Sequence, residues 1–109
     1  MLALSVMFAG GRLYAEDNNL EELKKQAEAG NPRAQAELGK CYEEGKGVPQ
    51  SLSQAASLYR QAAEQGHPEA QLALAACFEQ GLGVDRNPAA ARYWRRRAAE
   101  NSQTTIPES

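Results

Sequence analysis

Four arginines crowd one short stretch near the C-terminus, ARYWRRRAAE. Guanidinium groups bind carboxylates and phosphates through paired hydrogen bonds, and the neighbouring Tyr93 and Trp94 offer rings for stacking. The stretch is therefore a candidate site for an acidic partner. We favour a simpler interpretation, because cations near a helix C-terminus suit the helix dipole and keep an outer helix face soluble. The candidate residues are Arg92, Arg95, Arg96 and Arg97.

Side chains suited to catalysis are scarce. His67 is the single histidine, so a Ser-His or Cys-His dyad has only one available base. It directly precedes Pro68, and we expect a helix-cap or loop role for it. No opposing base accompanies the polar residues near the predicted helix ends, which we expect to face solvent: Glu43, Glu44, Glu79 and Gln80. The sequence predicts no enzyme, no metal site and no cofactor.

The composition suits one globular domain. Of 109 residues, 42% are hydrophobic and 24% charged, and a chain of this length forms one core. The net charge of -2 and the pI near 5.4 give no reason to expect nucleic acid or an anionic membrane as partner. No apolar run approaches the ~18 residues of a membrane-spanning helix, so we expect no membrane insertion of the mature chain.

The chain repeats itself with a period of 36 residues. Laying residues 30–65 over 66–101 without a gap gives 15 identities in 36 positions, where chance predicts roughly two or three. The segment 19–29 matches the end of the same unit, so a half-repeat precedes two full ones. The identical residues of the first unit are Gly30, Pro32, Ala34, Gln35, Leu38, Cys41, Glu43, Gly45, Gly47, Val48, Ala55, Arg60, Ala62, Ala63 and Glu64.

Each unit contains two predicted helices. The first begins after Asn31-Pro32 or His67-Pro68, where a cap residue precedes a proline at the first helical position. It ends at Gly45 or Gly81, since glycine adopts the left-handed closing conformation at least cost. The second helix begins at Ser51 or at Asn87-Pro88. Small and apolar residues recur with a helical period, which predicts stacked helical hairpins that share a core; Trp94, which aligns with Leu58, is expected in that core.

The pattern A-x-x-G-x-x-x-A-x-x-x-L-G-x-x-Y-x-x-G-x-G-V from Ala27 to Val48 resembles the Sel1-like repeat, a relative of the tetratricopeptide repeat (TPR). The second copy keeps most positions but has Ala75 for Gly39 and Phe78 for Tyr42. The resemblance covers about residues 19–100. It implies an all-α fold, an α/α solenoid (TPR-like superhelix) of about two and a half repeats and roughly five helices, without catalytic residues.

The resemblance also implies where a partner binds. In stacks of this kind the first helices of the units line the concave face, and a peptide or partner helix docks there. Spacing places eight residues in successive rows on those helices: Gln35, Glu37, Lys40, Glu44, Gln71, Ala73, Ala76 and Gln80.

The two cysteines occupy the same position in successive units. Equivalent helices lie ~8–10 Å apart, whereas a disulfide requires Cα atoms within about 7 Å. We therefore expect Cys41 and Cys77 to be buried free thiols.

Residues 1–15 form a separate segment, MLALSVMFAGGRLYA. An apolar stretch of this length followed by the acidic EDNN resembles a secretory signal peptide, with the mature chain starting at Glu16. The segment departs from a typical signal peptide in two ways. No basic residue precedes Leu2, and Leu13 stands at the third position before the cut, where a small residue is preferred. The alternative is an N-terminal helix that caps the open end of the solenoid.

Together these observations predict three parts: the segment 1–15, a repeat domain at 16–101 and a flexible tail at 102–109. The predicted function is non-catalytic binding of another protein or peptide, as an adaptor in a bacterial envelope or secretion-linked process. The alternative is a structural subunit or fragment that self-associates through its exposed ends, for example as a homodimer. The expected location is periplasmic or extracellular if residues 1–15 are cleaved, and cytoplasmic if they are retained.

Overall fold

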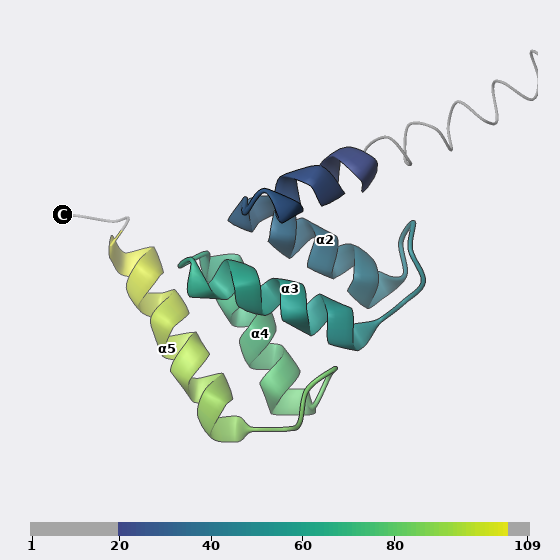
Figure 1. Ribbon diagram of the computed structural model, residues 1–109. Helices are drawn as coiled ribbons and strands as arrows, with labels where there is room; N and C mark the ends of the chain where they lie inside the picture. Colours follow the sequence, from purple (N-terminus) through teal and green to yellow (C-terminus); the bar gives the residue numbers. More distant parts are fainter. Residues whose placement is uncertain (1–19, 105–109) are drawn as a thin grey trace, which may run out of the picture.

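The computed structural model describes residues 20–104, which are helical throughout apart from turns and loops. After a helical segment at 20–28 come α2 (Pro32–Glu44), α3 (Leu52–Glu64), α4 (Pro68–Gln80) and α5 (Pro88–Thr104). Figure 1 shows these helices stacked as antiparallel neighbours. The pairs α2 with α3 and α4 with α5 form the two hairpins, and α3 packs on α4 to join them. The predicted all-α solenoid of five helices is confirmed for residues 20–104.

The helix starts follow the predicted cap residues. The Asn31 side chain accepts hydrogen bonds from the backbone N–H groups of Arg33 and Ala34, at 2.9 and 3.2 Å. Ser51 Oγ accepts one from the N–H of Gln54 at 3.3 Å. These bonds satisfy amides that lack a partner within the first helical turn.

The first helix of each unit ends on a glycine in the left-handed conformation. Gly45 has φ 70° and Gly81 has φ 72°, and their N–H groups donate to the carbonyls of Cys41 and Cys77. A residue with a Cβ is strained there, which explains why both units carry glycine.

The C-terminal helix extends further than expected. α5 runs to Thr104 and thus includes residues 102–104, which the sequence assigned to a flexible tail. No glycine or proline interrupts this stretch, and the Asn101 side chain donates to the carbonyl of Gly66 at 3.1 Å. That bond holds the end of α5 against the turn between α3 and α4.

The core consists mainly of alanines around a few larger side chains. Ala62, Ala63, Ala70 and Leu74 are completely buried. Small residues let the helices approach closely, and stacked units bury surfaces that one hairpin leaves exposed. Trp94 packs against this core but stays half-buried, so its predicted core position is only partly correct.

Equivalent polar pairs join the two helices of each hairpin. In the first unit the Tyr59 hydroxyl donates to Glu43 Oε1 at 2.5 Å. In the second unit Arg95, which aligns with Tyr59, pairs with Glu79, which aligns with Glu43. Glu79 is exposed, as expected, although it pairs with Arg95. The expectation that Glu43 faces solvent was only partly correct, because Glu43 is half-buried and accepts a hydrogen bond from the second helix of its hairpin.

Candidate functional site

A hollow of about 490 Å³ lies between the first helices of the two units. We call it the α2–α4 groove. Its lining includes three residues that the sequence predicted to form successive rows, Glu37, Lys40 and Ala73. Glu43, Tyr59 and Glu69 complete its polar surface. The stacking of α2 beside α4 thus brings part of the predicted binding surface together.

The α2–α4 groove is acidic. It contains three carboxylates, on Glu37, Glu43 and Glu69, against one ammonium group, on Lys40. Glu37 forms an exposed ion pair with Arg33 at 3.4 Å, which solvent screens strongly. Burial and the hydrogen bond to the Glu43 carboxylate raise the pKa of Tyr59 well above its usual range. The phenol therefore stays protonated and remains a donor to Glu43 at the floor of the groove.

A second hollow of about 370 Å³ adjoins the groove along α2. Glu37 and Lys40 line both hollows, and Glu44, Cys41 and Leu23 line only the second. The predicted residue Glu44 therefore lies beside the groove and not within it.

Ala76 and Gln80 lie on α4 but line neither of these two hollows. Ala76 is half-buried and Gln80 is exposed.

Two of the predicted binding residues are buried, which corrects their assignment. Gln35 is 4% exposed and Gln71 is 0% exposed. The Gln71 amide donates to the carbonyl of Ala63 at 3.0 Å and accepts from Asn101 at 2.9 Å. Gln35 makes the corresponding bonds to the carbonyl of Ala27 and to Gln65. These glutamines connect successive units in the core, because each donates a hydrogen bond to a backbone carbonyl near the C-terminal end of the preceding helix.

The arginine stretch does not form one cluster. Arg95 pairs with Glu79 of α4. Arg97 lies over the rings of Tyr93 and Trp94, 5.7 and 5.9 Å from their centres, and donates to the Tyr93 hydroxyl at 2.7 Å. Arg92 and Arg96 are exposed and, among the described residues, join no ion pair. Two of the four guanidinium groups thus contact other side chains, although Arg95 is exposed like Arg92 and Arg96.

The thiols and the histidine also have defined places. Both cysteines are free, as predicted, but only Cys77 is buried, and Cys41 is half-buried at the edge of the second hollow. Burial raises the pKa of the Cys77 thiol to about 11 and also raises that of Cys41, so both resist ionisation. His67 occupies the predicted cap position, yet its side chain makes no cap hydrogen bond.

Sequence reasoning missed Tyr59, Glu43 and Glu69 as groove residues. Tyr59 is buried in the core, but its hydroxyl reaches the groove. The sequence repeat does not indicate this contact, because the second unit has Arg95 in place of a tyrosine at the aligned position.

Within residues 20–104 no three His, Cys, Asp or Glu side chains gather as metal ligands. Among the same residues, no helix has the length and apolar character needed to cross a bilayer.

A family model described as the Sel1 repeat matches residues 32–67 and 68–102. The two matches cover well over half of the chain. The chain belongs to the Sel1 repeat family. The family's units start about two residues later than the predicted units at 30 and 66, and they coincide with the first residues of α2 and α4.

Similar proteins come from bacteria. The secretory immunoglobulin A-binding protein EsiB of Escherichia coli O6:H1, strain CFT073, is 43% identical over 60 residues, which cover 54% of this chain and 12% of EsiB. The crystal structure of a Sel1 repeat protein from Oxalobacter formigenes is 40% identical with a TM-score of 0.73, covering 74% of this chain and 62% of that one.

A third relative is a protective antigen of uropathogenic Escherichia coli strains with an SLR fold. Its structure is 41% identical with a TM-score of 0.71, and the match covers 74% of this chain and 17% of that chain. The chain thus spans only part of the length of each of these relatives.

Proposed function

We propose that this Sel1 repeat chain is a non-catalytic protein-binding module and that the α2–α4 groove receives a basic segment of its partner. The observation that carries the proposal is the groove itself, where three carboxylates face one ammonium group on rigid helices. Complementary charge at such a surface steers association and selects the partner. The similarity to EsiB, named for binding secretory immunoglobulin A, supports protein binding as the class of function.

Charge reversal in the groove tests this function. Glu37→Lys combined with Glu69→Lys is expected to weaken partner capture at least about tenfold, because two attractive contacts become repulsive. The matched control is Glu64→Lys with Glu100→Lys, two exposed glutamates outside the groove. Tagged wild type and both variants are cross-linked in the native bacterium, and captured proteins are quantified by mass spectrometry. Equal loss in both variants, or unchanged capture in the groove variant, contradicts the proposal.

The second part of the proposal is that the module acts in the bacterial envelope or in a secretion-linked process. It rests on the apolar segment 1–15 and on the small residue Ala15 before the acidic Glu16. The same captured bait tests it, since its N-terminal peptide can be sequenced. A chain starting at Glu16 in the envelope fraction is the expected result, and a chain starting at Met1 in the cytoplasmic fraction contradicts export.

A further inference from the structure

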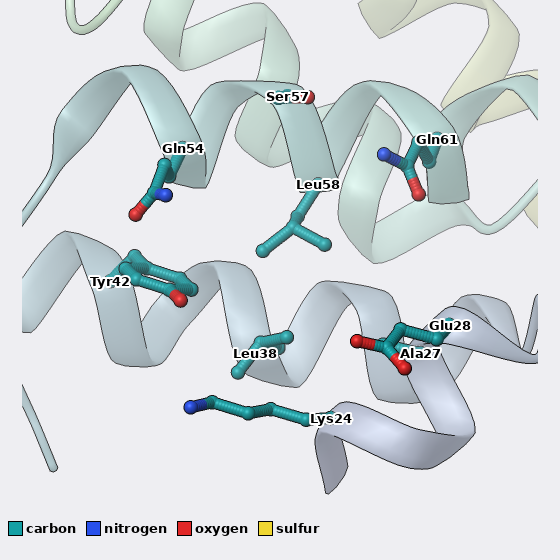
Figure 2. Close-up of a pocket in the computed structure, with 9 residues that line it drawn as sticks. All are labelled: Lys24, Ala27, Glu28, Leu38, Tyr42, Gln54, Ser57, Leu58 and Gln61. Atoms are coloured by element: carbon teal, nitrogen blue, oxygen red, sulfur yellow. The ribbon is translucent and has the colours of Figure 1, made fainter. Parts of the chain in front are cut away.

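A separate hollow of about 420 Å³ lies between the helical segment 20–28 and α3, with α2 as its floor. Figure 2 shows Leu58 reaching from α3 toward Leu38 and Tyr42 of α2, while Lys24 of the N-terminal segment lies at the opposite edge. Leu38 is buried, and Leu58 and Tyr42 are half-buried. We call this the Leu58 hollow. It shares no lining residue with the α2–α4 groove.

The second repeat shows what fills the corresponding space. The 36-residue register aligns Leu38 with Leu74, Tyr42 with Phe78 and Leu58 with Trp94. In the second repeat Trp94 packs against the core cluster that contains Leu74 and Phe78. An indole therefore covers the apolar floor there.

Cations complete the covering of the second repeat. The Arg60 guanidinium lies 5.7 Å from the centre of the Phe78 ring, and that of Arg97 lies 5.9 Å from the centre of the Trp94 ring. In the first repeat the aligned residues are Lys24 and Gln61. Both line the Leu58 hollow, so one cation remains at its edge.

The first repeat therefore keeps the apolar floor but lacks the indole. Leucine is smaller than tryptophan and has no aromatic face, and Ser57 stands where the second repeat has Tyr93. An open hollow with an apolar floor and a few polar groups at its rim is typical of a binding pocket.

We propose that the Leu58 hollow binds an aromatic side chain, above all a tryptophan indole, from a segment of a partner protein. The apolar floor packs against the ring, and the Lys24 ammonium at the edge can lie over its face. Gln54 and Gln61 at the rim offer amides to the backbone of the same segment. Aromatic anchors in such pockets carry much of the energy of protein interfaces. The inference rests on the proposed protein-binding function but uses a different surface.

The test uses the full chain labelled for NMR and titrated with N-acetyltryptophanamide, with N-acetylleucinamide as the comparison probe. We expect saturable shifts of the Leu38 and Leu58 methyl signals with the tryptophan amide and at least about tenfold weaker binding of the leucine amide. Leu58→Trp supplies the indole from within, as the second repeat does, and is expected to abolish the binding.

Leu72→Trp is the matched control, because Leu72 is 51% exposed on α4 and lies outside the hollow. It adds a tryptophan without filling the hollow and is expected to leave the shifts unchanged. Circular dichroism and thermal melting confirm that both variants are folded. Equal binding of the two amides, or unchanged binding in Leu58→Trp, overturns the proposal, as does an absence of shifts.

Two further measurements distinguish partner binding at the Leu58 hollow from self-association and from binding at the α2–α4 groove. If the same methyl shifts appear on concentrating the protein alone, a second copy occupies the hollow and the proposal fails. The variant with Glu37→Lys and Glu69→Lys changes no residue that lines the Leu58 hollow and is expected to retain the tryptophanamide shifts. Failure of the groove and failure of the Leu58 hollow are therefore distinguishable.

Discussion

Gly83→Ala is expected to lower the free energy of unfolding by at least about 3 kcal/mol, whereas Gly47→Ala is expected to lower it by only about 1–2 kcal/mol. Both glycines have positive φ, 74° and 80°, so alanine strains the backbone similarly at the two positions. They differ in their surroundings. A Cβ at Gly83 would lie 2.1 Å from the carbonyl oxygen of Leu52, at the start of α3. Among residues 20–104, a Cβ at Gly47 would meet only the Leu20 side chain, at 3.2 Å.

The difference between the two variants isolates the contact between repeats. A side-chain end can rotate away, but the carbonyl of Leu52 belongs to a helix that the core holds in place. Relief of the clash at Gly83 therefore requires the loop of the second repeat to move away from the first. Urea unfolding of both variants, followed by circular dichroism, measures the two losses. Equal losses would show that the loop does not pack against α3 as described.

Gln71→Leu is expected to destabilise the protein by about 2–3 kcal/mol, although leucine is more apolar. The substitution removes the donor to the carbonyl of Ala63 and the acceptor for Asn101. A buried polar group left without a partner costs about 1–3 kcal/mol. Gln80→Leu, at an exposed position of the same helix, serves as control and should change stability by less than about 0.5 kcal/mol.

Gln71→Glu separates hydrogen bonding from packing at the same position. Glutamate has nearly the shape of glutamine, but as a carboxylate it cannot donate to the Ala63 carbonyl, and burial opposes its charge. Its pKa in the folded protein is therefore raised above the unfolded value. Relative to the wild type at each pH, the variant is expected to be least stable near neutral pH and to recover as the pH falls toward the unfolded pKa. Equal stability of Gln71→Leu and wild type would contradict a structural role of the amide.

The sequence predicted the fold because its local signals agree. The caps at Asn31 and Ser51 mark helix starts, and Gly45 and Gly81 mark helix ends. The small residues between these signals recur in both copies of the repeat. Repetition also supplies the tertiary arrangement, since each unit must pack on a copy of itself. The helix end at Thr104 was missed, because the bond from Asn101 to Gly66 is a long-range contact.

The candidate site was predicted only in part. Glu37, Lys40 and Ala73 could be placed on the first helices from spacing alone, and they do line the groove. Gln35 and Gln71 were misplaced because a polar side chain ordinarily indicates a surface, and only the structure reveals the buried carbonyls of Ala27 and Ala63 that they satisfy. The Leu58 hollow arises because Leu58 is smaller than the aligned Trp94. The alignment shows the smaller side chain, but only the structure shows that the space stays open.

The most direct test of the account is site-specific photo-cross-linking in the native bacterium. A benzophenone amino acid replaces Lys40 in the α2–α4 groove, and in a parallel strain it replaces the exposed Arg92 of α5. We expect one predominant protein to be cross-linked from position 40, with a lower yield when Glu69→Lys is added and almost none from position 92. Equal yields from both positions, or no cross-linked protein from position 40, would contradict the groove as the binding surface.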